Sequence, residues 1–339
     1  MTAATPERLP APTTGPNTFV RGTRPADVAV VIVTYNSAAD IGPLLASLRA
    51  ATSGLRMRVV VVDNDSTDHT LAVLERQWDV AVCASGGNRG YAGGINVALR
   101  QIGAARSVLV LNPDLVVRPD AVRAMLACLE STGAGIVVPR LVDPEGAPQR
   151  SIRREPTVLR SFGEAVFGDR ARFRPAWLAE TVYDRQSYRH AHPVEWATGA
   201  ALLIDRALAD SIGDWDERYF LYSEETDYFR RAREAGRAVW FEPAATVAHR
   251  QGGSGISAGQ AALMSVNRVR YAERYGSRAA ATWVHLAVIL HAALRAGRSA
   301  DRYALGILLD RRRWAALPHA TLPDSRLSGV GPAPIGPGA

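Results

Sequence analysis

Short polar side chains directly follow four apolar runs of the sequence, at places where a carboxylate or an amide can hold a ligand. The segments are Thr34-Tyr35-Asn36, Asp63-Asn64-Asp65, the glycine-rich 86–96 and Asn112-Pro113-Asp114. Mg²⁺ and Mn²⁺ bind in proteins through a few carboxylates together with the phosphates of a substrate. Pro113 holds Asn112 extended and gives Asp114 a defined direction. Asp114 is therefore a predicted ligand of a divalent metal.

An ordinary structural role competes with ligand binding at each of these places, because asparagine, aspartate and glycine are also the usual residues of turns. Asn64, Asp65 and Ser66 are explained equally well as a turn with Ser66 capping a helix predicted over 66–77. Four polar segments that converge on one edge are harder to explain as turns alone.

A second set of carboxylates, Glu224, Glu225 and Asp227, opens a helix predicted from Ser223 to Ala235. At 100° per residue, Glu225 lies on the same side as the apolar residues that face the core. Asp227 points towards water, where it forms a surface pair with Arg231, and Glu224 lies at the border. A carboxylate that is partly removed from water is suited to be a general base, so Glu225 is the predicted base.

His249 stands after another apolar stretch and before the glycine-rich segment 252–255. A single histidine is more often structural than a ligand, but imidazole is a ligand for Mn²⁺ and related metals. Its place after a predicted strand matches that of Asp114. His249 is therefore the second predicted metal ligand.

The elements that must position these residues alternate between strand and helix over residues 28–111. Continuous apolar runs rich in valine and isoleucine (28–34, 58–63, 80–83 and 107–111) predict strands buried on both faces, separated by helices near 41–51, 66–77 and 92–102. This alternation predicts an α/β fold with a doubly wound, mostly parallel sheet. Ligands of such sheets bind outside the carboxyl ends of the strands, where the polar segments stand.

The composition excludes several kinds of chemistry. The sequence contains 40 arginines and no lysine. It therefore has neither a lysine that could form a Schiff base nor the lysine of a P-loop. The segment 86–96 does not fit the dinucleotide pattern either. Cys83 and Cys128 are the two cysteines and form no CxxC, which is typical of a reducing compartment. The net charge of +7 favours anionic partners or reflects a coding bias.

The ends of the chain differ from its middle. Residues 1–26 and 318–339 are rich in proline and small residues, which predicts disorder. Residues 27–255 are predicted to form the main domain, with a nucleotide-binding half at 27–118 and an acceptor half at 119–255. Residues 256–317 are predicted to be a helical C-terminal extension. The apolar run at 279–294 is too short for a membrane span and carries two histidines.

Several motifs in the right order resemble the family-two nucleotide-diphospho-sugar glycosyltransferases of the A-type fold, and in particular their bacterial rhamnosyl- and galactofuranosyl-transferase-like members. The resemblance covers about residues 28–255. Its carriers are VIVTYNS, VVVDNDSTD, NRGYAGGIN, LNPD, FLYSEETDYFRRAREAG and AHRQGG.

The resemblance implies a role for each matching position. The residues implied for the nucleotide are Thr34, Tyr35, Asn36, Asp63, Asp65, Asn88, Gly90, Tyr91, Asn96 and Asn112. Asp114 becomes the last residue of the family's metal motif, in which Asn112 replaces the usual first aspartate, and His249 completes the site for Mg²⁺ or Mn²⁺. Glu225 matches the catalytic base, with Glu224 and Asp227 as the alternatives if the register slips.

The implied reaction is an inverting transfer of a sugar, such as rhamnose, from a dTDP- or UDP-sugar to a hydroxyl of a glycan or a lipid-linked acceptor in cell-surface polysaccharide synthesis. It implies no nucleic acid partner and a cytoplasmic enzyme, at the inner face of the plasma membrane if the arginine-rich extension contacts lipid. Two other interpretations of this extension are that it packs on the main domain or that it forms a dimer interface.

Two other functions are compatible with such a sheet. A sugar-nucleotide pyrophosphorylase would carry an N-terminal glycine-rich loop with basic residues, which the segment 31–42 lacks. A non-catalytic binding protein for nucleotide sugars or glycans would have no need of Asp114, Glu225 and His249. Both are therefore less favoured than a glycosyltransferase.

Overall fold

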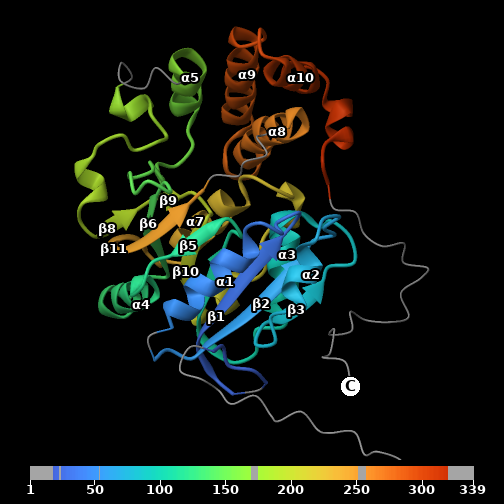
Figure 1. The fold of residues 1–339 in the computed structure, drawn as a ribbon. Helices are drawn as coiled ribbons and strands as arrows, with labels where there is room; N and C mark the ends of the chain where they lie inside the picture. The colour runs from blue at the N-terminus through green and yellow to red at the C-terminus, as the bar shows by residue number, and fades with distance from the viewer. Residues whose placement is uncertain (1–17, 23, 53, 169–174, 251–256, 320–339) are drawn as a thin grey trace, which may run out of the picture.

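A computed structural model describes residues 18–22, 24–52, 54–168, 175–250 and 257–319 (Figure 1). Within these residues a nine-stranded sheet runs through the molecule in the order β3-β2-β1-β4-β10-β6-β11-β5, and β8 pairs with β11. The strands are β1 (Ala26–Thr34), β2 (Met57–Asp63), β3 (Ala81–Ala84), β4 (Ala105–Leu111), β5 (Leu115–Val117), β6 (Ile136–Val142), β8 (His192–Val194), β10 (Ala201–Asp205) and β11 (Val239–His249). The short strands β7 (Ile152–Arg153) and β9 (Trp196–Ala197) form a separate pair.

The first half of the sheet is parallel, as the sequence predicts. β1 pairs in parallel with β2 and with β4, and β2 pairs in parallel with β3. β10 is antiparallel to both β4 and β6, while β6 and β11 are again parallel. The prediction of a mostly parallel α/β sheet is therefore confirmed, with β10 as an antiparallel strand in its middle.

Helices cover both faces of the sheet because alternate residues of each buried strand point to opposite sides. On one face Val30 and Ile32 of β1 share an apolar core with α1 (Ile41–Ala50), α2 (Thr70–Leu74) and α4 (Ala121–Thr132). On the other face Val31 packs with α3 (Gly90–Leu99), α6 (Arg206–Ile212) and α7 (Glu224–Glu234).

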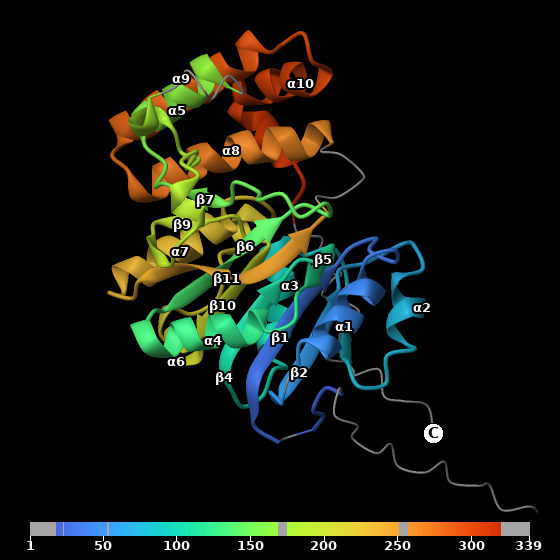
Figure 2. The same cartoon turned by 60° about the vertical axis from the view of Figure 1, so that its left-hand side comes forward.

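A further layer of helices lies over the carboxyl edge of the sheet (Figure 2). It consists of α5 (Val158–Phe167), α8 (Ala258–Tyr275), α9 (Arg278–Leu294) and α10 (Ser299–Leu308), with short 3₁₀ turns at Ala176–Leu178, Gln186–Tyr188, Glu217–Tyr219 and Arg311–Ala316. Leu263, Val288 and Ile307 form the core between α8, α9 and α10. The predicted C-terminal extension is thus a packed helical unit, and α5 from the middle of the chain joins it through Phe162 against Trp283. No described helix is long and apolar enough to cross a membrane.

Two sequence predictions about local structure are wrong. The helix predicted over 66–77 begins only at Thr70, and Ser66 does not cap it. The hydroxyl of Ser66 donates instead to Asp63 at 2.6 Å. The carboxylate of Asp68 accepts a hydrogen bond from the backbone amide of Thr70 at 2.9 Å.

Disorder was predicted for all of 1–26, but in the part of this segment that the structure describes Phe19 is buried in the core and its amide donates to Asp79. The prediction of disorder rested on the average composition of residues 1–26, which gives no weight to a single residue such as Phe19 that packs in the core. Residues 1–17 and 320–339, where disorder was also predicted, lie outside the described residues. The division of the main domain at 118 stays a prediction.

Candidate active site

A cavity of about 480 Å³ lies between the first turn of α7, the ends of β4 and β11, and the inner sides of α5 and α8. Its lining joins side chains from distant parts of the sequence. The polar side chains that line it include Tyr91, Asn112, Arg153, Glu164, Glu180, Thr181, Glu224, Glu225, His249 and Arg268. The predicted base and the predicted metal-binding histidine therefore meet in one cavity.

Glu224 and Glu225 enter this cavity as adjacent carboxylates, and Arg153 lines the same cavity. One carboxylate oxygen of each, Oε2, is buried and has no hydrogen-bond partner among the residues that the structure describes. Burial raises the pKa of Glu224 well above its usual value, and the neighbouring charge of Glu225 raises it further. Burial also raises the pKa of Glu225, although backbone hydrogen bonds and Arg153 act in the opposite direction. Such carboxylates accept a proton readily, as a general base must.

The loop before α7 has a strained backbone that fixes where the two glutamates point. Phe220, Tyr222 and Ser223 have positive φ angles of 62°, 70° and 72°, which non-glycine residues seldom adopt. Asn267 of α8 is fully buried beneath this loop. Its amide nitrogen lies 2.7, 2.9 and 2.8 Å from the carbonyl oxygens of residues 219, 221 and 222. The helical layer therefore holds the glutamates in place through one asparagine.

Two glycines allow close packing around the same turn. Gly90 has a φ of 72°, and a Cβ atom there would come within 2.2 Å of the carbonyl oxygen of Phe220. A Cβ on Gly199 would lie 3.1 Å from the Cβ of Glu225. Both positions therefore favour glycine, and Gly90 has a packing role in the loop, while its predicted contact with the nucleotide stays a prediction.

Asp114 and His249, the two predicted metal ligands, are neighbours. β5 pairs with β11 so that Leu115 is opposite His249, and this register brings His249 Nε2 to 3.4 Å from Asp114 Oδ2. The other ring nitrogen of His249, Nδ1, is buried and finds no hydrogen-bond partner in the described part of the chain, which omits residues 251–256. A carboxylate, an imidazole and an unsatisfied buried nitrogen beside the cavity fit a hard or borderline divalent cation. The described residues contain no cluster of three or more histidine, cysteine, aspartate or glutamate residues, so a cation here would need further ligands from a substrate.

The residues predicted to hold the nucleotide converge at the carboxyl edge of the first four strands, as the sequence indicates. Thr34 donates to Asp63 at 3.0 Å, and the amide of Thr67 donates to Asn36 at 2.8 Å. Tyr35, Asn36 and Asp65 are exposed on this edge, whereas Thr34 and Asp63 are buried and stabilise it.

The loop after β3 is tied to the same edge. Asn64 donates to Asn88 and to the carbonyl of Gly90, both at 3.0 Å. Tyr91 follows, and its hydroxyl is buried and unpartnered at the cavity. Burial raises the pKa of Tyr91, as do the charges of Glu224, Glu225 and Asp114. Tyr91 and Asn112 are the predicted nucleotide-binding residues that line the cavity itself.

Comparisons with known proteins agree with this geometry. The sequence model described as Glycosyl transferase family 2 matches residues 29–191. An N-acetylglucosaminyl-diphospho-decaprenol L-rhamnosyltransferase of Mycobacterium tuberculosis is 33% identical over 233 residues, which are 65% of this chain and 75% of the relative. The chain belongs to glycosyl transferase family 2. It is therefore a glycosyltransferase of cell-surface glycan synthesis, as the sequence predicts, and not a pyrophosphorylase or a non-catalytic binding protein.

Other similar proteins place the glycosyltransferase in the same group. A low-salt glycan biosynthesis hexosyltransferase of Haloferax volcanii is 32% identical over 216 residues, covering 61% of this chain and 62% of the relative. Among solved structures, a mannosyltransferase from Pyrobaculum calidifontis in complex with GDP-Man and Mn²⁺ has a TM-score of 0.53 and 16% identity. It covers 87% of this chain and 76% of that chain. This likeness establishes the shared fold.

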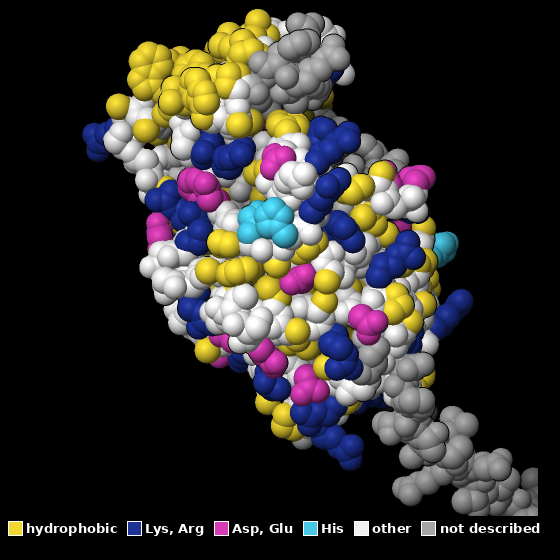
Figure 3. Space-filling model, turned by 90° about the vertical axis from the view of Figure 1, so that its left-hand side faces the viewer, with side chains coloured by type: hydrophobic (Ala, Val, Ile, Leu, Met, Phe, Trp, Pro, Cys, Tyr) yellow, Lys and Arg dark blue, Asp and Glu magenta, His cyan; other side chains and the backbone are white. Residues whose placement is uncertain are grey.

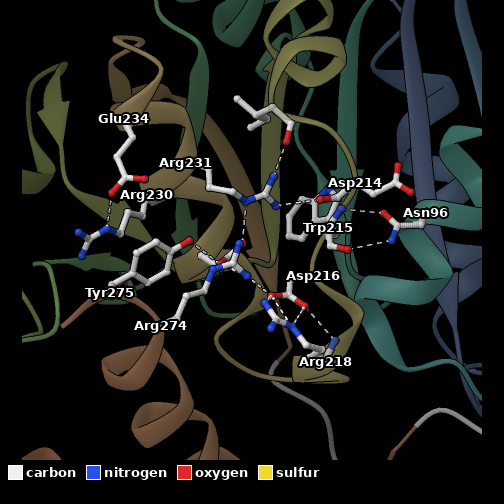
Figure 4. A network of polar contacts seen from close by, with 12 residues as sticks. Asn96, Asp214, Trp215, Asp216, Arg218, Arg230, Arg231, Glu234, Arg274 and Tyr275 are labelled. Atoms are coloured by element: carbon white, nitrogen blue, oxygen red, sulfur yellow. Dashed lines mark hydrogen bonds and ion pairs between the residues drawn. The ribbon is translucent and has the colours of Figure 1, made fainter. Parts of the chain in front are cut away.

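The prediction for Asp227 is wrong in one respect. The glycosyltransferase pairs Asp227 with Arg231 at 2.8 Å, as expected, but the carboxylate is fully buried and does not face water. The hydroxyl of Tyr275 donates to it at 2.6 Å and Arg274 lies 3.1 Å away, both from α8 (Figure 4). The helical layer covers this side of α7, which helical phase alone could not reveal. With all these partners, Asp227 is a poor alternative base.

The prediction of nucleotide contact for Asn96 is also contradicted. Asn96 is buried, and both ends of its amide are used by the backbone of Trp215, at 2.9 Å in each direction (Figure 4). Its nitrogen also donates to Glu217 at 2.9 Å. Asn96 therefore connects α3 to the segment before α7, and it is not among the residues that line the cavity.

Several residues of the site were not predicted from the sequence. Arg153 and Glu180 come from the irregular region between β6 and β8, and Arg268 comes from α8, where it forms an ion pair with Glu180. Asn267 does not line the cavity and acts on it through the carbonyls of residues 219, 221 and 222. No motif marks these residues, and the arginine-rich composition around Arg153 was the single signal in the sequence.

Proposed function

We propose that this glycosyltransferase performs a single inverting displacement with Glu225 as the general base. Glu225 accepts the proton of an acceptor hydroxyl as the hydroxyl oxygen forms a bond to the anomeric carbon of the donor sugar. The bond from that carbon to the diphosphate oxygen breaks, and its electron pair leaves with the nucleoside diphosphate. Glu224 is the alternative base, because its carboxylate lines the same cavity.

The observation that carries this proposal is the adjacency of buried Glu224 and half-buried Glu225, each with one buried oxygen that has no hydrogen-bond partner among the described residues, in a cavity that Asn112 and His249 also line. Keeping two acidic groups beside each other in a buried position lowers stability unless a ligand uses them. Asp114 is adjacent to this cavity through His249. His249 lines the cavity with Glu225, while Asp114 contacts His249 but is not among the residues that line the cavity, so one site for base and metal remains part of the proposal.

The donor is proposed to be a nucleotide-diphospho-sugar whose base and ribose lie on the exposed edge formed by Tyr35, Asn36 and Asp65. Asp114 and His249 would hold Mg²⁺ or Mn²⁺ together with the diphosphate. A cation there, when bound, offsets negative charge on the leaving diphosphate. Asn112 in place of an aspartate leaves Asp114 as the carboxylate of the predicted metal motif.

The acceptor is proposed to be a sugar joined by a diphosphate to a polyprenol, and the donor sugar to be rhamnose. The support is the relative from Mycobacterium tuberculosis, whose name states a rhamnosyl transfer and a diphospho-decaprenol acceptor. The alignment covers 75% of that relative. The free cysteines Cys83 and Cys128 are consistent with a reaction at the cytoplasmic face of a membrane.

The experiment is a transfer assay with dTDP-rhamnose and an N-acetylglucosaminyl diphosphate carrying a short alkyl chain. Product formation with Mn²⁺ or Mg²⁺, its loss on adding a chelator, and the anomeric configuration of the product are measured. We expect an inverted anomeric centre and recovery of activity when the metal is restored. A retained configuration would contradict the single displacement, and a panel of other nucleotide sugars identifies the donor if rhamnose is not transferred.

An apolar surface on the helical layer supports contact with the membrane that presents such an acceptor. Figure 3 shows hydrophobic side chains gathered at the upper end of one face, over this layer. On α5, α9 and the 3₁₀ turn Ala176–Leu178, the large apolar side chains that are more than half exposed are Leu159, Val166, Trp177, Trp283 and Leu294. Exposed arginines of the same layer, Arg278 in α9 and Arg298 and Arg302 at the start of α10, complement anionic lipid headgroups.

This contact is tested by cosedimentation with vesicles of phosphatidylglycerol and phosphatidylcholine. We expect binding that weakens at high salt and is lost in a variant with Leu159→Ser, Trp283→Ser and Leu294→Ser. The matched control is Val116→Ser with Trp78→Ser, two exposed apolar residues on other parts of the molecule. Equal binding by both variants would exclude the helical layer as the contact.

A further inference from the structure

A second cavity, of about 880 Å³, lies beside the active site and is lined by arginines. It is formed by the end of β6, the segment after it and the segment around the 3₁₀ turn Gln186–Tyr188. The arginines in its lining are Arg140, Arg150, Arg153, Arg185 and Arg189. No aspartate or glutamate belongs to this lining as the described residues form it. The cavity therefore concentrates positive charge.

The described residues provide few counter-charges for these arginines. None of the five forms an ion pair with a described carboxylate, although Arg153 acts on the charge of Glu225. Nε of Arg140 is buried without a hydrogen-bond partner, and Arg150 stacks on the ring of Tyr183. By contrast, the half-buried Arg268 is paired with Glu180. Guanidinium groups that converge with few counter-charges suit a ligand with several phosphate oxygens.

The arginine cavity adjoins the active site. Arg153 and Thr181 line both cavities. Gln149, at the other side of the arginine cavity, donates through its side-chain amide to the carbonyl oxygen of His249 at 2.8 Å. A ligand whose phosphates lie among the arginines can thus extend a sugar towards Glu225.

The position of the cavity separates it from the donor's edge. The predicted nucleotide residues follow β1 to β4, whereas Arg140 lies in the second half of β6, which is separated from β4 by β10 in the sheet. The segment from the exposed Trp177 to Arg189 connects the apolar surface of the helical layer to the arginine cavity. On the face drawn in Figure 3, arginines lie below the hydrophobic upper end.

We infer that the arginine cavity binds the diphosphate of the acceptor, with the acceptor's sugar in the active site and its lipid chain directed to the apolar surface. The inference rests on the proposed function, since it assigns a place to the diphosphate of a lipid-linked acceptor. Three parts of such a molecule, lipid, diphosphate and sugar, match three adjoining surfaces of this chain.

The test compares two acceptors and two variants. The acceptors are an N-acetylglucosaminyl diphosphate with a short alkyl chain and the alkyl N-acetylglucosaminide that lacks the diphosphate. The variant Arg150→Gln with Arg189→Gln removes two charges at the outer part of the cavity and leaves Arg153 in place. The control, Arg76→Gln with Arg100→Gln, removes two exposed charges elsewhere.

We expect the KM of the cavity variant for the diphosphate acceptor to rise roughly ten- to thirtyfold, because two charge-assisted contacts are lost. Its KM for the donor, its kcat/KM for the alkyl glycoside and all constants of the control stay near those of the wild type. An equal loss with both acceptors, a rise in the donor KM, or no change would each overturn the assignment. Thermal unfolding checks that the cavity variant is folded.

A binding measurement separates this inference from the proposed function. Isothermal titration of the diphosphate acceptor, without donor, needs no turnover. If the wild type transfers no sugar but binds this acceptor about tenfold more tightly than the cavity variant, the proposed reaction fails and the diphosphate site stands. If inorganic pyrophosphate binds as tightly as the acceptor, or the wild type binds neither, the acceptor assignment is overturned.

Discussion

Two carboxylate sites on one helix differ in what surrounds them. Glu224 and Glu225 open α7 and line the active-site cavity, where one oxygen of each is buried without a partner. Asp227 lies two residues after Glu225 and is fully buried, but Arg231, Arg274 and Tyr275 contact its two oxygens. Within four residues the helix thus shields two sets of carboxylates from water. Asp227 has cationic and hydroxyl partners that compensate its charge, and Glu224 and Glu225 each have a buried oxygen without a partner among the described residues.

This difference separates buried charges that serve the reaction from buried charges that stabilise the structure. An uncompensated buried carboxylate has a raised pKa and lowers stability, so it persists where a substrate needs it. A compensated one ties elements together, and Asp227 ties α7 to α8. Variants at the two sites should therefore move different measurements.

The largest effect is expected at the uncompensated site. Glu225→Gln keeps the shape of the side chain and removes its ability to accept a proton. We expect kcat to fall by about 10²- to 10⁴-fold, the range typical for loss of a general base. The free energy of unfolding should stay the same or rise, because a buried charge beside Glu224 is removed. Transfer kinetics and urea unfolding measure the two quantities.

The matched variant Glu224→Gln distinguishes the two glutamates. If Glu225 is the base, Glu224→Gln reduces kcat much less than Glu225→Gln does. The reverse order would assign the proton transfer to Glu224. Equal, small effects of both variants would contradict a catalytic role for this pair.

The compensated site should respond in stability. Asp227→Asn removes the buried counter-charge of Arg231 and one of the two carboxylates that contact Arg274, the other being Asp216. Breaking such a buried pair costs about 3 kcal/mol of unfolding free energy. The kcat of the protein that remains folded should fall less than tenfold. Urea unfolding and active-site-normalised kinetics at low temperature test this. A loss of kcat as large as that of Glu225→Gln, with normal stability, would make Asp227 part of the chemistry.

Asn267 connects the two sites and should show a smaller, mixed effect. Asn267→Ala removes the donor to the strained loop at 219–222, so about 2 kcal/mol of unfolding free energy is expected to be lost. The kcat should fall about tenfold as the glutamates lose their fixed direction. Ser265→Ala is the control, since its hydroxyl donates only to Ala261 within α8. Unchanged kcat would show that the loop keeps its conformation without Asn267.

Much of the fold could be predicted from the sequence because its signals are local. The valine-rich runs that became β1, β2 and β4 are buried on both faces, as continuous apolar runs indicate. Asp114, His249 and Glu225 were identified because each stands at the end of a strand or the start of a helix. The pairing of β5 with β11 brings Asp114 next to His249, and His249 lines the same cavity as Glu225.

The rest depends on contacts that no local pattern contains. Asp227 was placed in water because helical phase describes α7 alone, while α8, some forty residues later in the chain, covers that side. Asn96 was assigned to the nucleotide from its motif, but its amide is used by Trp215, more than a hundred residues away. The arginine cavity is likewise assembled from three separate segments whose sequence is irregular.

The pH dependence of stability gives the smallest expected difference between the two carboxylate sites. The folded protein holds a proton on Glu224 more tightly than the unfolded chain does, because burial and the charge of Glu225 raise its pKa from the usual 4.5. The favourable contribution of the protonated form is complete below pH 4.5 and is lost as the pH rises through the raised value.

Each unit by which the pKa is raised corresponds to about 1.4 kcal/mol of unfolding free energy on the alkaline side. Glu224→Gln should therefore be more stable relative to wild type at pH 7.5 than at pH 4.5. The measurement is urea unfolding of both proteins at the two values. An equal difference at both would mean that Glu224 titrates normally. Its carboxylate would then be no more desolvated than one in water, and the contrast with the compensated Asp227 would lose its physical basis.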